Sequence, residues 1–303
     1  MKNLFFKIMP GKFFQNNEYG SMFYYFYDII IARQKQTYSL RYIMKPHAFA
    51  ICAYMDSPYL ESCIRSIKAQ SVESDVIMCT STPSSYISGL ADKYGIPLFI
   101  RHEKSSIRDD WNFAYYMADA TFVTIAHQDD LYQKDYVKML LDCYGSYPDM
   151  TLFTGGYTVV KKDRLAVFEP VEFIKRFLRL PLRLRFISHL SWVKKSVLLF
   201  GNSICCPACA YNKEQLGELL FTSPYHFALD WDTLYKLSKL PGRFVCVEKP
   251  ILYYRVHEEA ATKAAIEDNS RLKEETEMFK KMWPEPVVKV LMHFYRKAYH
   301  EYE

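Results

Sequence analysis

Residues 109–132 read Asp-Asp-Trp-Asn-Phe-Ala-Tyr-Tyr-Met-Ala-Asp-Ala-Thr-Phe-Val-Thr-Ile-Ala-His-Gln-Asp-Asp-Leu-Tyr, and this stretch decides the fold. It opens with two carboxylates, as helix N-termini commonly do, and apolar residues recur at helical spacing from Phe113 to Ala120. Residues 121–126 then form a β-branched, apolar run without polar alternation, which is typical of a strand covered on both faces. The stretch therefore predicts a helix followed by a central strand of an α/β sheet.

Adjacent carboxylates follow this strand in the motif His127-Gln128-Asp129-Asp130. Open α/β sheets bind ligands beyond the carboxyl ends of their strands, so the pair stands where a ligand would be held. Paired carboxylate oxygens suit Mg²⁺ or Mn²⁺, which can bridge the phosphates of a nucleotide. The alternative is a polar turn before a helix that starts near Lys134. The buried strand in front of the motif favours the ligand site.

The composition is that of a globular chain of 303 residues with a mild net charge of +5. Half of the residues are hydrophobic, which is enough for one large or two small domains. The charge is compatible with anionic substrates or a membrane surface and does not require nucleic acid. The eight cysteines stand mostly in apolar runs, as reduced core residues of a cytosolic protein do. The lone Cys206-Pro-Ala-Cys209 motif favours buried thiols over a zinc site.

The first 45 residues differ in pattern from the rest. Their apolar stretch, Met22–Ala32, is interrupted by Asp28 and is too short to span a bilayer, which takes about 20 residues. Residues 1–10 lack the apolar core and cleavage site of a signal peptide. We expect a helical arm over residues 1–45 that docks on the following domain or contacts a partner or a membrane.

Strands and helices alternate after this arm. The expected strands are 47–53, 75–79 and 96–100, and the expected helices are 59–69 and 86–94. Alternation on this scale predicts a mostly parallel βαβ sheet with right-handed crossovers. The sequence has neither a GxGxxG turn after the first strand nor a GxxxxGK[ST] loop, which argues against dinucleotide-binding and P-loop proteins.

Several short motifs follow one another in the first half of the chain. They are Ile-Cys-Ala-Tyr-Met-Asp-Ser-Pro-Tyr-Leu-Glu-Ser-Cys-Ile-Arg-Ser-Ile from residue 51, Thr80-Ser81-Thr82-Pro83, Asp110-Trp111-Asn112 and the His-Gln-Asp-Asp-Leu-Tyr segment from residue 127. In their order and spacing they resemble the family 2 glycosyltransferases of GT-A fold. The likeness covers residues 46–160 well and continues more weakly to about residue 262. It implies a mixed Rossmann-like α/β sheet flanked by helices, with a GT-A domain over residues 46–262 and a helical tail over residues 263–303.

The resemblance implies a nucleotide-sugar site at the strand ends, with a UDP-sugar as the expected donor. The second strand of the family commonly ends in Asp-Asp-Gly-Ser, whose first Asp binds the uracil. Here Thr80 and Ser81 stand in those places and offer hydroxyl groups instead. Tyr54 and Gln128 are expected to line the same pocket. Asp110 is the remaining carboxylate that would bind a uracil or ribose edge.

The family also holds a divalent metal, Mg²⁺ or Mn²⁺, with an Asp-x-Asp motif. Here His127 takes the first position and Asp129 is kept, so the resemblance implies that Asp129 is a metal ligand. Asp130 would assist it or cap the next helix. The segment Tyr-Arg-Val-His that ends at His257 resembles the family's Tyr-Arg-x-His and would bring His257 to the metal or the diphosphate. Arg255 would add positive charge near the leaving group.

A catalytic base is implied at the start of the helical segment Phe227–Leu237. The family opens this helix with a Glu-Asp pair; Leu229 replaces the Glu and Asp230 matches the Asp, with Asp232 as the alternative. Asp230 would accept the proton of the acceptor hydroxyl. Otherwise it is an acid at a helix N-terminus, where the helix dipole favours negative charge.

Residues 161–200 interleave Arg and Lys with Phe and Leu. Such a stretch can lie on an anionic membrane, or it can form a solvated helix face whose apolar side covers the sheet. Pro181 breaks any long helix, and both interpretations stay open. Residues 201–211 are expected to form a strand that enters the site.

The sequence thus predicts a metal-dependent, inverting glycosyltransferase of GT-A fold in the cytoplasm or at the inner face of the membrane. Its acceptor would be a cell-surface glycan or a lipid-linked saccharide, and it would bind no nucleic acid. One alternative is a nucleotidyltransferase, which usually needs a glycine-rich phosphate loop that this chain lacks. The other is a catalytically silent binding module that keeps the fold.

Overall fold

The computed structural model describes residues 45–161, 164–166, 170–256 and 270–300. The chain divides into two compact units, residues 1–43 and 44–303, and every described residue lies in the second. The expected N-terminal arm therefore lies outside the described residues apart from Lys45, and so does His257. The expected C-terminal tail belongs to the same compact unit as the sheet.

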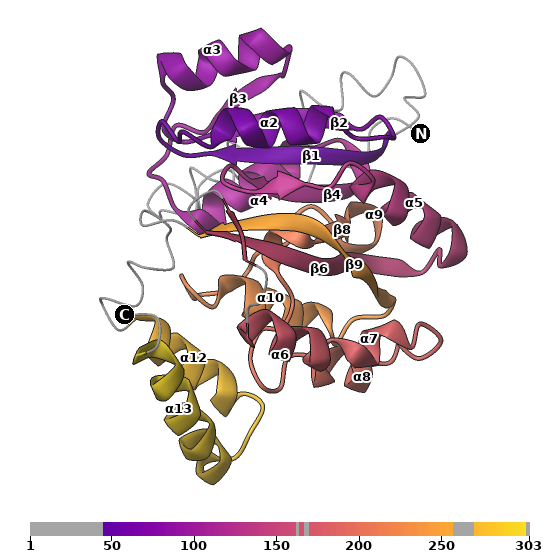
Figure 1. The fold of residues 1–303 in the computed structure, drawn as a ribbon, viewed down its shortest axis with the longest axis vertical. Helices are drawn as coiled ribbons and strands as arrows, with labels where there is room; N and C mark the ends of the chain where they lie inside the picture. Colours follow the sequence, from indigo (N-terminus) through magenta and orange to yellow (C-terminus); the bar gives the residue numbers. More distant parts are fainter. Residues whose placement is uncertain (1–44, 162–163, 167–169, 257–269, 301–303) are drawn as a thin grey trace, which may run out of the picture. The chain divides into compact units, whose positions relative to one another are not determined.

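A mixed sheet of nine strands forms the centre of the described residues (Figure 1). The strands are β1 (Lys45–Ala53), β2 (Asp75–Thr80), β3 (Leu98–Ile100), β4 (Ala120–His127), β5 (Leu131–Tyr132), β6 (Met150–Lys161), β7 (Arg164–Leu165), β8 (Ala210–Asn212) and β9 (Arg243–Val256). Their order is β3-β2-β1-β4-β8-β6-β9-β5, with β7 pairing β6. Strands β3, β2, β1 and β4 are parallel, whereas β8 is antiparallel to β4 and β6. The predicted α/β class with a mixed sheet is confirmed.

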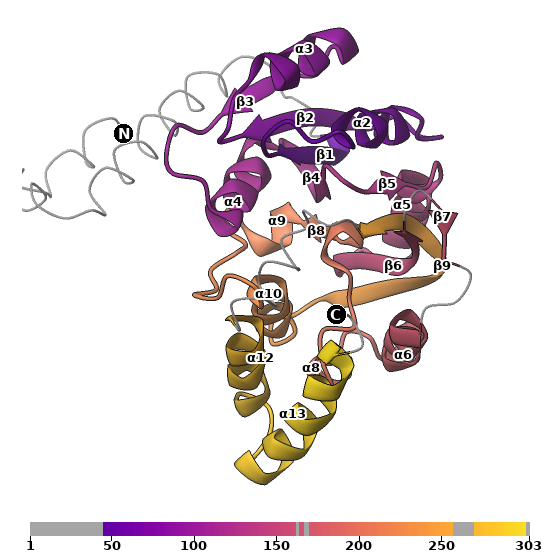
Figure 2. The same ribbon diagram turned by 60° about the vertical axis from the view of Figure 1, so that its left-hand side comes forward.

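Helices cover both faces of this sheet, as Figures 1 and 2 show. They are α2 (Leu60–Lys68), α3 (Ser85–Tyr94), α4 (Ile107–Met117), α5 (Tyr136–Ser146), α6 (Pro170–Leu178), α7 (Leu180–Arg183), α8 (Ser191–Ser196), η1 (Cys206–Ala208), α9 (Lys213–Leu216), α10 (Leu229–Leu237), α12 (Ser270–Lys280) and α13 (Glu285–His300). The predicted strands and helices between residues 47 and 126 are present, with ends within two residues of those expected except that α4 ends at Met117 and Ala120 begins β4. None of the described helices combines the length and the apolar character needed to cross a bilayer.

Two hydrophobic cores lie on the two faces of the sheet, and β1 contributes to both. Ala48 and Ala50 pack into the core with α4, α8, α10, α12 and α13, whereas Phe49 and Ile51 pack into the core with α2, α3 and α5. Alternate residues of a strand point to opposite faces, so an uninterrupted apolar strand fits a sheet covered on both sides. This is why β1 and β4 lack polar alternation.

The segment 201–211 is not one strand, contrary to the sequence prediction. It contains the short helix η1 and then β8, because Pro207 has no N–H to donate to a ladder. Both thiols of the CxxC motif are buried here. Cys206 Sγ lies 3.8 Å from the Tyr211 hydroxyl, and Cys209 Sγ lies 3.7 Å from the Thr154 hydroxyl.

A series of hydrogen-bonded polar side chains links β1, β4 and α5. His47 Nδ1 pairs with Ser74 Oγ at 2.7 Å, and His47 Nε2 pairs with Thr124 Oγ1 at 2.9 Å. Thr124 Oγ1 in turn pairs with the Tyr136 hydroxyl at 2.8 Å, which joins β1 and β4 to α5. Burial lowers the pKa of His47 to about 3, so the ring is neutral at pH 7.

We predict that His47 makes the fold sensitive to acid. The unfolded chain titrates this ring near pH 6.5 and binds more protons than the folded chain below that pH, so stability is lost as the pH falls from 6.5 towards 3. Between pH 7.5 and 5, the wild type should lose about 2 kcal/mol of unfolding free energy more than His47→Gln, measured by urea denaturation. The exposed His102 is the control, and His102→Gln should keep the wild-type pH dependence. Parallel pH curves for wild type and His47→Gln would contradict the assignment.

Candidate active site

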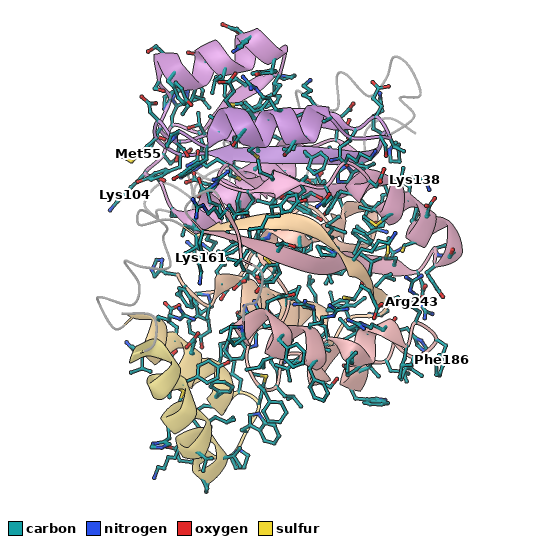
Figure 3. All side chains as sticks on the ribbon, in the orientation of Figure 1. Met55, Lys104, Lys138, Lys161, Phe186 and Arg243 are labelled. Carbon is teal, nitrogen blue, oxygen red and sulfur yellow. The ribbon has the colours of Figure 1, made fainter. Side chains whose placement is uncertain are left out.

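The carboxyl ends of β1 and β4 are joined by a reciprocal pair of hydrogen bonds. The Tyr54 amide donates to Gln128 Oε1, and Gln128 Nε2 donates to the Tyr54 carbonyl, both at 2.9 Å. Met55 follows with a φ of 53°, and its amide donates to Thr82 Oγ1 after β2 at 2.7 Å. A positive φ is uncommon for a residue with a side chain, so this loop is tightly specified. Figure 3 shows Met55 projecting from this edge of the sheet, with Lys104 nearby.

The structure brings Ser81 and Asp110 together at this edge. Asp110 Oδ2 accepts hydrogen bonds from Ser81 Oγ at 3.0 Å and from Ser105 Oγ at 2.8 Å. Asp110 Oδ1 accepts from Arg101 Nε at 2.8 Å, and the Arg101 side chain is buried. Asp110 is therefore an ion-paired centre that holds the ends of β2, β3 and α4 in place.

Thr80 does not line the surface of this edge, contrary to the sequence expectation. It is 3% exposed, and its hydroxyl accepts the Thr82 amide at 3.0 Å. As the last residue of β2, it points into the protein while Ser81 lies outside the strand. Tyr54, by contrast, is exposed. The residues presented around the edge are thus Tyr54, Ser81, Asp110 and Gln128, with Thr80 behind them.

The two carboxylates after β4 have different environments. Asp129 is partly exposed, and its Oδ1 accepts a hydrogen bond from Ser57 Oγ at 3.2 Å. Asp130 is 2% exposed, and its Oδ1 accepts the Arg255 amide of β9 at 2.9 Å. Arg255 also donates from Nε to the Asp129 carbonyl at 3.1 Å and stacks over the Tyr59 ring. Arg255 therefore ties β9 to this turn.

Asp130 is not presented to solvent as a metal ligand, which corrects the sequence expectation. Burial raises the pKa of its carboxyl well above the usual range. Its Oδ2 is buried and has no hydrogen-bond partner among the described residues. A buried, unpaired carboxylate oxygen is costly, so Asp130 is held protonated or is compensated by a nearby cation.

His127 also carries an unsatisfied buried atom. Its ring stacks on Trp111 of α4, with centroids 4.9 Å apart. Its Nε2 is buried without a hydrogen-bond partner among the described residues. Burial lowers the pKa of His127 to about 4, so the ring is neutral at pH 7. Two orphaned polar atoms, on His127 and Asp130, thus flank Asp129.

The described residues fit a metal bound together with a nucleotide better than a metal held by the protein alone. They contain no group of three or more His, Cys, Asp or Glu side chains that could hold an ion. Mg²⁺ is typically held by one or two carboxylates together with substrate phosphates and waters. Asp129 offers such a carboxylate, and His257, the other expected ligand, lies outside the described part of the chain.

Asp230 stands in the first turn of α10, partly exposed. Its Oδ2 accepts from Asn202 Nδ2 at 2.8 Å, and its Oδ1 accepts from the Trp231 amide at 2.7 Å. Burial raises the pKa of Asp230 to about 6, although these hydrogen bonds and the charge of Lys175 act in the opposite direction. A carboxylate with a pKa near the working pH is suited to accept a proton.

Asp232, the alternative base, has a structural role. It is 1% exposed and forms ion pairs with Lys281 at 2.6 Å and Lys236 at 2.9 Å. Burial opposes ionisation, but these two lysines hold the pKa of Asp232 below its usual range. Lys281 follows α12, so this carboxylate joins the C-terminal helices to α10.

The turn at Cys205 and Cys206 is within electrostatic reach of both Asp130 and Asp230. Burial raises the pKa of the Cys205 thiol, and the charge of Asp130 raises it further while that of Lys175 lowers it. Burial raises the pKa of Cys206 as well, with a further contribution from Asp230. Asp130 and Asp230 therefore act on adjacent residues of one turn, although they are far apart in sequence.

The sequence analysis did not identify Glu274 of α12, which accepts hydrogen bonds from the backbone at the start of α10. Its Oε1 accepts the His226 amide at 3.0 Å, and its Oε2 accepts the Phe227 and Ala228 amides at 2.7 and 2.9 Å. The N-cap residue of α10, Ala228, makes no side-chain capping hydrogen bond, and Glu274 instead holds the backbone that leads into the helix. In sequence, Glu274 sits in a charged helical tail and resembles a solvated residue, so no local signal identifies it.

A second carboxylate of α12, Glu275, faces the same region. It is buried and pairs with Arg271 at 3.2 Å. Burial raises the pKa of Glu275 to about 6, and the charges of Lys175 and Asp230 act on it. The C-terminal helix α12 thus contributes both to the position and to the electrostatic surroundings of Asp230.

Comparison with known proteins identifies the fold from structure alone. No family model and no curated protein matches the sequence. The mannosyltransferase PcManGT from Pyrobaculum calidifontis, with GDP-Man and Mn²⁺, is similar at a TM-score of 0.56 and 15% identity, over 91% of this chain and 76% of that one. S. aureus TarS 1-349 with UDP-GlcNAc is similar at 0.53 and 15%, over 82% and 70%.

Two further structures agree. Glucosyl-3-phosphoglycerate synthase from Mycobacterium tuberculosis, with Mn²⁺, UDP and its product, is similar at a TM-score of 0.50 and 13% identity, over 75% of this chain and 77% of that one. TarS 1-349 with UDP is similar at 0.50 and 16%, over 70% of this chain, and the chain spans only 60% of its length. The described chain therefore has the fold of the GT-A glycosyltransferases.

We predict that Glu274 stabilises the start of α10. Glu274→Gln removes the charge that three backbone amides share, and it should lower the free energy of unfolding by about 1–3 kcal/mol, measured by urea denaturation. The control is Glu285→Gln in α13, which removes an exposed ion pair with Lys280 and should change stability by less than about 0.5 kcal/mol. Equal small effects of both substitutions would contradict the capping role.

Proposed function

We propose that this chain is a glycosyltransferase that moves a sugar from a nucleotide diphosphate, with UDP as the expected nucleotide, to a saccharide or lipid-linked saccharide. The observation that carries the proposal is Asp230. It is oriented by Asn202, and its pKa is raised to about 6, in a protein of GT-A fold. A purely structural acid at a helix N-terminus would be expected to stay below its usual pKa, because the helix dipole stabilises its charge.

The donor nucleotide is proposed to bind at the edge formed by Tyr54, Ser81 and Asp110. Tyr54 offers an exposed ring for stacking on a base, and the Ser81 hydroxyl can hydrogen-bond its edge. The ion pair of Asp110 with Arg101 fixes these groups before the donor arrives. The similar structures from S. aureus hold UDP and UDP-GlcNAc, and that from P. calidifontis holds GDP-Man, which supports a nucleotide-sugar of this kind.

The diphosphate is proposed to lie against Asp129 together with Mg²⁺ or Mn²⁺. The metal would neutralise the charge that develops on the leaving phosphate oxygen. Asp129 would hold the metal, and Ser57 orients its carboxylate. Arg255, which is fixed by its contacts with Asp129 and Asp130, places positive charge beside the same turn.

The reaction is proposed to be a single displacement with inversion at the anomeric carbon. The acceptor oxygen attacks that carbon, its proton passes to the Asp230 carboxylate, and the bond from the carbon to the diphosphate oxygen breaks. Asn202 keeps the Asp230 carboxyl oriented during this step. The base and the leaving group must flank the sugar from opposite sides, and the shared influence of Asp130 and Asp230 on the Cys205–Cys206 turn supports two carboxylate sites in one region of the protein.

We predict that Asp230→Asn lowers kcat by about 10²–10⁴-fold while the Kd for the nucleotide changes by less than about threefold, because a base acts mainly in the transition state. Single-turnover transfer and calorimetric titration with UDP measure the two quantities. In the wild type, kcat should rise with pH through about 6, as Asp230 loses its proton.

The matched control is Asp232→Asn, which removes a buried ion-paired carboxylate from the same helix. It should lower the unfolding free energy by about 3 kcal/mol, whereas the turnover of the folded fraction stays within about threefold of wild type. Loss of turnover in Asp232→Asn but not in Asp230→Asn would move the base. Retained donor binding without transfer by the wild type, across a panel of acceptors, would favour a silent binding module.

We also predict that Asp129→Asn weakens UDP binding by at least about tenfold in the presence of Mn²⁺ and leaves binding in EDTA unchanged, because the lost carboxylate acts through the metal. Titration calorimetry with and without Mn²⁺ measures this. A wild type whose transfer rate is unaffected by excess EDTA would overturn the metal assignment.

A further inference from the structure

Helix α6 is amphipathic, and its apolar side faces outward. Ile174 and Phe177 are 57% and 67% exposed, and α6 contains no buried residue. A helix that covers a sheet buries its apolar stripe and exposes its charges. In α6 this arrangement is reversed, whereas Leu182, Val193 and Val197 later in the same stretch are buried in the core.

The inward side of α6 is charged and well bonded. Glu172 pairs with Arg179 just beyond the helix end, and Arg179 donates to the Ser203 carbonyl and is 2% exposed. Lys175 and Arg179 both lie over the ring of Tyr157 in β6. These contacts fix the rotation of α6 about its axis, so the outward position of its apolar side is imposed by buried ion pairs.

Further exposed apolar side chains follow α6 in the segment that contains α7 and α8. The side chains that share high exposure are Ile174, Phe177, Leu184, Phe186 and Trp192, which we call the outer apolar surface. Phe186 and Trp192 are 72% and 63% exposed. Helix α7 packs beside α6, α8 and β9, and Phe186 projects from the protein beyond α7 (Figures 1 and 3).

The charge of this region matches an anionic partner. Residues 170–200 contain seven Lys or Arg and one Asp or Glu, a net charge of +6, whereas the whole chain carries +5. Arg176 is exposed, and Arg185 and Lys195 are partly exposed, among the residues of the outer apolar surface. Arg179 and Lys194 are buried and Lys175 faces Tyr157, so Arg176, Arg185 and Lys195 supply the positive charge beside the outer apolar surface.

We propose that the outer apolar surface binds the headgroup region of an anionic lipid bilayer. Aromatic and aliphatic side chains that alternate with Arg and Lys suit the boundary between headgroups and acyl chains. Protein interfaces are different, because their cores are depleted of charged residues, above all Lys. The long stems of Arg and Lys can lie along the apolar layer with their charges among the lipid phosphates.

This surface lies on the opposite side of α6 from the proposed base. The charge of Lys175, on the inner side of the helix, acts on the carboxyl of Asp230. A helix with its side chains is about 10 Å across, so a bilayer under α6 would lie close to Asp230. Resting on the proposed function, this position favours a lipid-linked acceptor over a free saccharide, because such an acceptor is confined to the bilayer surface.

The test is co-sedimentation of the full chain with vesicles of phosphatidylcholine alone or with about 30 mol% phosphatidylglycerol. We expect binding to the anionic vesicles that weakens as salt is raised, and little binding to the neutral ones. The double variant Phe177→Ser, Phe186→Ser should bind at least about tenfold more weakly. Leu219→Ser, which removes an equally exposed apolar side chain outside the surface, should bind as the wild type does.

Binding is measured without donor or acceptor, so its outcome is independent of the proposed reaction. Donor hydrolysis without acceptor should be unchanged in the double variant, which shows that it is folded. Absent binding, or binding equally weakened by Leu219→Ser, would overturn the proposal. A dimer of the wild type that the double variant abolishes, without vesicle binding, would assign the surface to a second copy of the chain instead.

Discussion

The reciprocal hydrogen bonds between the Gln128 amide group and the Tyr54 backbone are the constraint on which the carboxyl edge of β1 and β4 depends. A side-chain amide that both donates to and accepts from one residue fixes two chain segments in distance and in rotation. Because β1 and β4 are parallel neighbours, their ends already lie at one edge, and this pair sets the loops that leave them. Met55, with its positive φ, is the next residue after Tyr54, and Asp129 is the next residue after Gln128.

Helix α10 is positioned by a different kind of interaction. It begins without a side-chain cap of its own, and the carboxylate of Glu274 in α12 accepts the backbone amides of His226, Phe227 and Ala228 just before it. Asp232 of α10 also forms an ion pair with Lys281, which follows α12. The C-terminal helices therefore hold α10 in place, because without them the backbone before α10 and the Asp232 carboxylate would lose these partners.

Burial divides chemically similar residues into different roles. Asp129 and Asp130 are adjacent, yet one is partly exposed beside Ser57 and the other is enclosed with an orphaned oxygen. Asp230 and Asp232 are two residues apart on one helix, and burial raises the pKa of the first while two lysines lower that of the second. Burial separates the members of the first pair, and burial together with charged partners separates those of the second, so the surroundings and not the residue type distinguish the structural carboxylate from the candidate for chemistry.

The sequence by itself determined the α/β class, the elements between residues 47 and 126 and the edge where Gln128 and Asp129 lie, because these follow from local periodicity and from the geometry of parallel strands. The structure also brought Ser81 and Asp110 together there. Only the tertiary structure decided that Thr80 and Asp130 are buried, that Glu274 caps α10 and that α6 turns its apolar side outward. The physical reason is that burial, ion pairing and helix rotation depend on which surfaces meet, and those surfaces come from segments far apart in the chain.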